Sequence, residues 1–171
     1  MKRETLIIIG VVLVALIIGV VVFFSGRGGV PNTSSAVANT QPSAVIVPFT
    51  EITRGSESTV ATRVNYVITS ADELNKLWEM VNATGTPPTI DFRTQAVIAV
   101  FAGQKSTGGY SIAVASVTDT GDTRTVAVTL TSPGTDCMVT ESFTNPYQIV
   151  TVPVSNASLA HTDTEVSKAC N

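Results

Sequence analysis

Apolar residues dominate the start of the chain from Leu6 to Phe24. No charged side chain interrupts this segment, and its Leu, Ile and Val side chains favour transfer into lipid. A bilayer core of roughly 30 Å needs about 20 apolar residues at helical rise, so the segment is long enough to span a membrane. The pattern therefore predicts a transmembrane helix over residues 6–24.

A cleaved signal peptide is the alternative interpretation of this segment. Its apolar region usually covers about 7–15 residues and ends at a small-x-small cleavage site. Here the bulky residues Val22, Phe23 and Phe24 stand where small ones are required, so we favour an uncleaved signal anchor. Lys2 and Arg3 precede the helix and favour a cytoplasmic N-terminus. We therefore expect a single-pass protein of the cell membrane with its C-terminal part on the extracytoplasmic side.

The composition changes after the anchor. Residues 25–43 are rich in Gly, Ser, Asn, Thr and Pro, with few large apolar side chains. Such a segment cannot bury enough surface to offset the entropy lost on ordering. We expect three parts: a cytoplasmic stub and signal anchor at 1–24, a flexible linker at 25–43, and one β-rich domain at 44–171.

One helix is predicted inside this domain. Ser70 stands three residues before Glu73, a capping box that gives partners to unpaired amides at a helix start. Apolar residues then recur at helical spacing and form one stripe, whose tryptophan has an alternative interpretation as an exposed anchor for a partner. Gly85 and the Pro87-Pro88 pair are expected to end the helix. The stripe consists of Leu74, Leu77, Trp78 and Val81.

The rest of the domain shows strand patterns separated by turns. Residues 95–102 are apolar on both faces, which indicates a central strand covered on both sides. Residues 110–115 and 126–131 alternate between large apolar and small or polar side chains, and the turn Asp119–Asp122 between them predicts an antiparallel hairpin. We expect an α+β fold: a mainly antiparallel β domain, sandwich or half-barrel-like, with one packed helix. Further strands are expected at 44–52, 63–69 and 147–154, with at most one edge strand after Ala157.

Charge and cysteine content restrict the partners and the compartment. The chain has 10 basic and 13 acidic residues and no basic cluster, which argues against nucleic acid as a partner. Its two cysteines, Cys137 and Cys170, are expected to form a disulfide on the oxidising side of a membrane. Two separate buried thiols are the alternative, whereas the spacing excludes a CxxC site.

The segment Gly103–Tyr110 is the most unusual local feature of the chain. A phosphate loop needs Gly-Lys-Ser/Thr followed by a helix. Here Gly108 is followed by Gly109, Tyr110 and a strand, so we reject that interpretation. Two hypotheses stay open: a glycine-bulged connection with Tyr110 packed inward, and a loop that contacts a partner.

Residues that could support catalysis or metal binding are sparse. His161, Asp163 and Glu165 would share one face of a strand, but a polar edge strand explains the same pattern. The chain has a single His and no Gly-x-Ser-x-Gly motif, and nothing pairs Asp91 with Glu141 for glycoside hydrolysis. We therefore expect no catalytic residues, no metal, no cofactor and no enzyme activity.

Several segments, taken in order, resemble the PrcB C-terminal domain family. The likeness extends over roughly Val45 to Asn171, and its Thr-Gly-Gly-Tyr and Pro-Tyr-x-Ile-Val elements are the most specific. A lipid-anchored family member would carry a lipobox Cys, whereas this chain has an apolar segment long enough to span a membrane. The matching segments are Asp72–Trp78, Pro88, Ile90–Phe92, Ala96–Val100, Ser106–Ile112, Cys137, Thr144–Val150 and Cys170.

The resemblance implies a role in protein binding. The family takes its name from an accessory subunit of a cell-surface protease complex, in which the domain supports assembly or stability. We therefore expect a membrane-tethered, extracytoplasmic accessory domain that binds an exported protein such as a protease. The alternatives are a protease inhibitor acting through the Ser106–Tyr110 loop and an envelope hydrolase. The expected partner-binding residues are Ser106, Thr107, Gly108, Gly109, Tyr110, Pro146 and Tyr147.

Overall fold

The structure, a computed structural model, describes residues 42–170 of the chain. The predicted transmembrane helix at 6–24 and linker residues 25–41 lie outside the described residues. Within the described range, no helix has the length and apolar character needed to cross a membrane. The predicted anchor, linker and membrane localisation therefore stay predictions.

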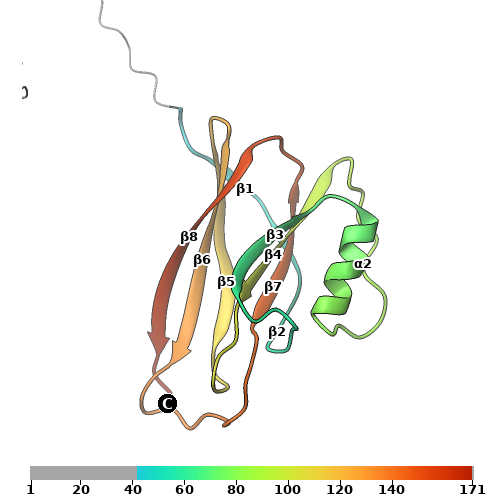
Figure 1. The fold of residues 1–171 in the computed structure, drawn as a ribbon. Coiled ribbons are helices and arrows are strands. Elements are labelled where there is room, and N and C mark those ends of the chain that lie inside the picture. The colour runs from blue at the N-terminus through green and yellow to red at the C-terminus, as the bar shows by residue number, and fades with distance from the viewer. Residues whose placement is uncertain (1–41, 171) are drawn as a thin grey trace, which may run out of the picture. The chain divides into compact units, whose positions relative to one another are not determined.

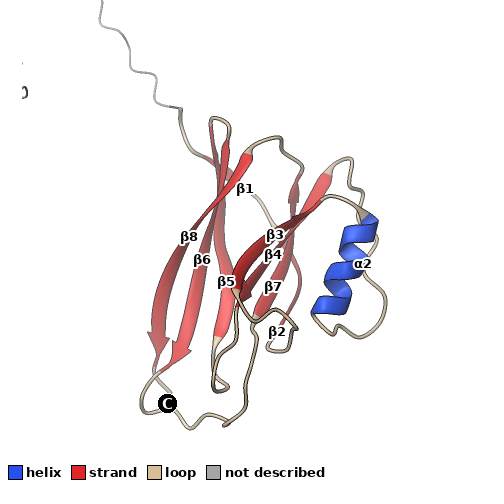
Figure 2. Cartoon of the chain, viewed as in Figure 1, coloured by secondary structure: helices blue, strands red, loops and turns tan. Residues whose placement is uncertain are grey.

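Two four-stranded sheets form the domain, with one helix beside the second sheet (Figures 1 and 2). The first sheet has the order β1 (Val45–Val47), β5 (Ser111–Thr120), β6 (Thr123–Pro133) and β8 (Ser158–Lys168). The second has the order β2 (Thr50–Gly55), β7 (Tyr147–Pro153), β4 (Gln95–Ala102) and β3 (Arg63–Ile68). The helix is α2 (Ala71–Met80). The expected mainly β fold with one packed helix is confirmed. The sequence had left a sandwich and a half-barrel-like form open, and the two sheets form a sandwich.

Strand β4 lies at the centre of the packing. Alternate residues such as Ile98 and Val100 face the first sheet and join a core with β5, β6 and β7. The intervening residues Val97 and Phe101 belong to a second core beneath α2. All four of these side chains are at most 1 % exposed. The prediction of a central strand covered on both sides is confirmed.

The helix begins as predicted and ends earlier. The Ser70 hydroxyl accepts the Glu73 amide at 3.4 Å, and the Glu73 carboxylate accepts the Thr69 amide at 2.8 Å. The helix stops at Met80, followed by Asn82 in the left-handed region with φ 48°. The prediction that Gly85 ends the helix was therefore wrong, because an asparagine can adopt this conformation itself.

The last strand, β8, is longer and differently oriented than the sequence pattern suggested. It has 11 residues and lies at the edge of the first sheet, parallel to β6. The parallel direction follows from where the strand begins: the Ser158 amide donates to the Asp122 carbonyl at 2.8 Å, beside the start of β6. Both arrowheads accordingly point the same way in Figure 1. The other strand pairs are antiparallel, as predicted.

One buried side chain joins the two sheets across the core. Strand β5 has a register irregularity between Val114 and Ser116. Gln148 of β7 is 2 % exposed, and its Oε1 accepts the Val114 amide at 2.6 Å. Its Nε2 donates to the carboxylate of Glu51 on β2. The pKa of Glu51 is lowered by hydrogen bonds, chiefly from Arg54 and then from Gln148. Gln148 thus satisfies a buried amide that the sheet itself leaves free.

We predict that Gln148→Leu destabilises the domain by about 1–3 kcal/mol, because the Val114 amide would lose its buried acceptor. Chemical denaturation of the wild type and the variant measures this difference. Gln104→Leu is the matched control, since Gln104 is exposed on a loop. An equal loss of stability in both variants would contradict the role of Gln148.

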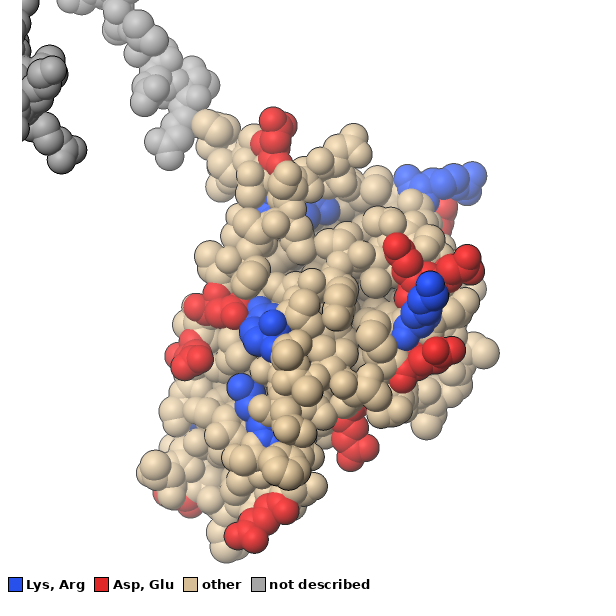
Figure 3. All heavy atoms as spheres, in the orientation of Figure 1, with Lys and Arg blue, Asp and Glu red and all other residues tan. Residues whose placement is uncertain are grey.

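A second inter-sheet contact involves a buried guanidinium. Arg124 of β6 has a side chain that is 7 % exposed and pairs with Asp119 of β5 through two bonds of 2.8 Å. It also donates to the carbonyl of Pro153, at the end of β7 in the other sheet. The hydrogen bonds from Arg124 hold the pKa of the Asp119 carboxyl below its ordinary value. On the face shown in Figure 3, acidic and basic side chains are interspersed among uncharged ones.

The Asp119–Arg124 pair predicts a specific acid sensitivity. Because the pKa of Asp119 is lowered in the folded state, its contribution to stability is complete above an ordinary carboxyl pKa of about 4 and is lost as the pH falls through the lowered pKa. Asp119→Asn should therefore be less stable at neutral pH and lose less stability between about pH 4 and pH 2. Denaturation curves across this pH range test it, with Asp122→Asn in the adjacent turn as control. Parallel pH profiles for Asp119→Asn and the wild type would rule the effect out.

Candidate functional site

Two loops meet at one end of the domain, where β8 also ends (Figure 1). The first loop leads from β4 to β5 and the second from β6 to β7, so both pass between the two sheets. Lys105 and Thr144 exchange backbone hydrogen bonds of 2.8 and 3.0 Å, and the Gly108 amide donates to the Thr140 carbonyl at 2.9 Å. We call residues 104–110 and 134–145 together the loop-end surface.

Close packing between the loops explains the glycine pair in the first loop. A Cβ on Gly108 would clash with the Thr140 hydroxyl. Gly109 has φ +86°, and a Cβ there would meet Pro133 at 3.0 Å and Val139 at 3.1 Å. The two glycines therefore let the loops touch. This agrees with the hypothesis of a structural glycine connection for these two positions.

The other predicted partner-binding residues differ in accessibility. Ser106 is exposed, and Thr107 and Tyr110 are half-buried. Pro146 and Tyr147 are buried, and the Tyr147 ring lies 6.1 Å from the Phe101 ring in the core beneath α2. These two residues belong to the interior, because β7 begins here and carries its first side chains inward. We therefore leave Pro146 and Tyr147 out of the candidate surface.

Two large apolar side chains on the second loop point into solvent. Met138 is 101 % exposed and Phe143 is 69 % exposed. Met138 also borders a groove of about 660 Å³ with Gly109 and Pro133. The sequence reasoning missed both residues, although apolar side chains in a segment rich in turn residues were a usable signal. Exposed Met and Phe are typical of surfaces that bind other proteins.

A disulfide holds this loop in place. Cys137 and Cys170 are bonded, with their Cα atoms 5.1 Å apart, which confirms the predicted pairing. The Gly134 amide also donates to the Lys168 carbonyl at 2.8 Å. The loop bearing Met138 is thus bound to the end of β8 on one side and to the 104–110 loop on the other. Such fixation limits the conformational entropy that a partner would have to remove.

We predict that Cys137→Ser/Cys170→Ser lowers the free energy of unfolding by about 3–4 kcal/mol, the chain-entropy value for closing a loop of this length. Denaturation of the wild type with and without reductant, beside the double variant, measures the effect. Reductant should lower the stability of the wild type to that of the variant and leave the variant unchanged. A wild type insensitive to reductant while its thiols titrate as free would contradict the prediction.

The sequence left two interpretations of His161, Asp163 and Glu165: a metal site and a polar edge strand. All three residues lie on the edge strand β8. Asp163 pairs with Arg63 of β3, with an Nη2–Oδ1 distance of 2.6 Å, and so links the edge strands of the two sheets. In residues 42–170 we find no group of three or more His, Cys, Asp or Glu side chains placed to hold a metal. Over the same range, no hydrogen bond joins the His161 ring to a Ser or Thr hydroxyl. Absence of enzyme activity stays a prediction.

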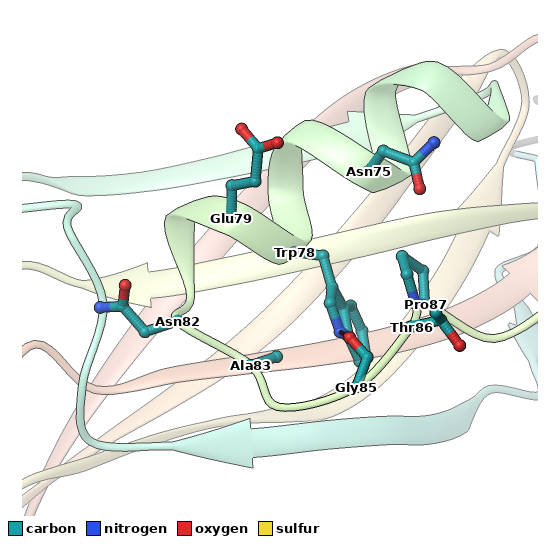
Figure 4. Close-up of a pocket in the computed structure, with 8 residues that line it drawn as sticks. All are labelled: Asn75, Trp78, Glu79, Asn82, Ala83, Gly85, Thr86 and Pro87. Atoms are coloured by element: carbon teal, nitrogen blue, oxygen red, sulfur yellow. Dashed lines mark hydrogen bonds between the residues drawn. The ribbon is translucent and has the colours of Figure 1, made fainter.

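Trp78 lies between helix α2 and the loop that follows it (Figure 4). The side chain is half-buried and packs against the core beneath the helix, and its Nε1 donates to the Gly85 carbonyl at 3.1 Å. It lines an open groove of about 630 Å³ together with Asn75 and Pro87. Because the ring and its polar group both have partners within the domain, this placement agrees with the core interpretation of Trp78.

The fold and the loop end define a class: a two-sheet β domain with a helix over one sheet and a disulfide-bound loop end. Residues 96–153, from β4 to the end of β7, match the family model described as PrcB C-terminal. The predicted family resemblance is therefore confirmed over these residues. Searches of curated proteins and of solved structures gave no significant match.

Proposed function

We propose that this chain is a membrane-tethered, extracytoplasmic binding domain that assists the assembly or stability of an exported partner, such as a surface protease. The family match supports an accessory role, since the family takes its name from an accessory subunit of a protease complex. The apolar segment at 6–24 and the disulfide support a tether and an oxidising compartment. No enzyme activity forms part of this proposal.

The observation that carries the proposal is the exposure of Met138 and Phe143 on a restrained loop. Burying a large apolar side chain in an interface stabilises a complex, and aromatic and Met residues are enriched in such interfaces. A restrained loop offers these side chains at a low entropic cost. The loop-end surface therefore suits a protein partner with apolar pockets facing it.

Direct protease inhibition is the second candidate, and the loop geometry favours it less. A loop that enters an active-site cleft must offer an extended and accessible backbone. Gly108 is buried here, and its amide already donates to Thr140. Thr107 is also tied to the second loop, because its carbonyl accepts the Thr144 hydroxyl at 2.9 Å. These contacts favour broad surface binding over insertion of residues 107–110.

A tether would add to the affinity of such a surface. Attachment through residues 6–24 would confine the domain to the volume that a linker of residues 25–43 can reach. The effective concentration near membrane-bound partners then rises without any new contact. A moderate interface of the kind centred on Met138 and Phe143 suffices under those conditions.

We predict that Met138→Ser/Phe143→Ser reduces recovery of the partner at least about tenfold, because two buried apolar side chains contribute a few kcal/mol to an interface. The measurement is affinity purification of the full-length chain from cross-linked membranes, followed by mass spectrometry. Val154→Ser is the matched control, because Val154 is 48 % exposed at the opposite end of β7.

Three results would contradict this assignment. The first is that the wild-type chain recovers no specific partner. The second is that the double variant recovers as much partner as the wild type, and the third is that Val154→Ser loses as much partner as the double variant. Adding the purified chain to a panel of proteases separates the two candidate functions. Stabilisation without loss of protease activity supports the accessory role, whereas stoichiometric inhibition abolished by altering residues 107–110 supports the inhibitor.

A further inference from the structure

A small cavity lies at the edge of the loop-end surface, where the chain passes from the second sheet to the first. Its volume is about 210 Å³, and residues of the first loop, β5, β6 and β8 line it. Leu130 of β6 is partly buried against the core, and Glu165 of β8 is its neighbour in the parallel register. Neighbours in register project to the same face of a sheet, so Glu165 lies on the core-facing side of β8. The cavity is thus at the open edge of the space between the sheets.

Opposite charges border this cavity without neutralising each other. The Lys105 ammonium lies 5.7 Å from the centre of the Tyr110 ring. The four ion pairs found in residues 42–170 include neither Lys105 nor Glu165. The side-chain hydrogen bonds over the same range leave both groups, and the Tyr110 hydroxyl, without a partner. The cavity therefore has one cationic and one anionic group available for a ligand, beside an aromatic ring and an aliphatic side chain.

We propose that this cavity binds a small zwitterion of the α-amino acid type. The ligand carboxylate would pair with Lys105 and its ammonium with Glu165, while its side chain would contact Tyr110 and Leu130. The volume is below the roughly 300–1,000 Å³ of sites for drug-sized ligands, which favours a ligand of this small size. Lys105 is half-buried and Glu165 is exposed. A ligand with both charges pairs with both groups at once, whereas a singly charged ligand leaves one of them unpaired.

Calorimetric titration of the full-length chain in mild detergent tests the proposal. The probes are L-leucine, L-phenylalanine, L-leucinamide, which has no carboxylate, and N-acetyl-L-leucine, which has no ammonium. For the wild type, at least one of the two free amino acids should bind, and each leucine derivative should bind roughly tenfold or more weakly than leucine if leucine is bound. If only phenylalanine binds, its amide and N-acetyl derivatives replace the leucine pair.

Two variants assign the two charges separately. In Lys105→Met the amino acid and its amide should bind equally, because the partner of the carboxylate is gone. In Glu165→Gln the amino acid and its N-acetyl derivative should bind equally, because the partner of the ammonium is gone. Lys76→Met and Glu79→Gln on the exposed face of α2 are matched controls and should behave as the wild type.

The outcomes decide the proposal independently of the protein-binding function. Absence of binding by both free amino acids overturns it, as does equal binding of the charged and blocked probes to the wild type. An equal effect of the control variants overturns it as well. Met138→Ser/Phe143→Ser should leave amino acid binding unchanged, so failure of the partner experiment and failure of this one can be told apart.

Discussion

The double-sided burial of β4 is the constraint on which the rest of the domain depends. A strand with apolar side chains on both faces needs a cover on each, and here the first sheet covers one face and α2 the other. Each cover is amphipathic, and each contributes one layer of side chains such as Val128 or Leu77, both at most 1 % exposed. The three-layer order of sheet, sheet and helix follows from this one strand.

The position of the candidate site follows from the end of the sandwich at which β4 and its neighbouring strands are connected. The chain leaves β4 in one sheet and enters β5 in the other, and later passes from β6 back to β7 at the same end. Two loops that cross the same gap are forced together, which is why Gly108 touches Thr140. The disulfide then ties the second loop to the end of β8. A surface built in this way is restrained by the sandwich and remains open to solvent.

Local patterns predicted much of the fold. The Ser70–Glu73 capping box, the two-faced strand at 95–102 and the hairpin around Gly121 each depend on a few neighbouring residues, and each is confirmed. The direction of β8 depends on which end of β6 the chain reaches after crossing between sheets, which no local pattern records. The end of the helix was missed because only Gly85 and the Pro87-Pro88 pair were considered as stop signals, whereas the helix stops at Met80 and Asn82 adopts the left-handed conformation.

The candidate site was harder to predict because accessibility is a property of the assembled sheets. Pro146 and Tyr147 stand in a specific motif, yet Tyr147 starts a covered strand and packs on Phe101. Met138 is an ordinary apolar residue in the sequence, and only the disulfide-bound loop holds it in solvent. Motif residues such as Gly108 and Tyr147 thus maintain the loop end from inside, whereas residues between them in sequence, such as Met138, remain exposed. In such a domain, a motif match indicates the scaffold, and the residues available for contacts have to be found from their exposure on the loops.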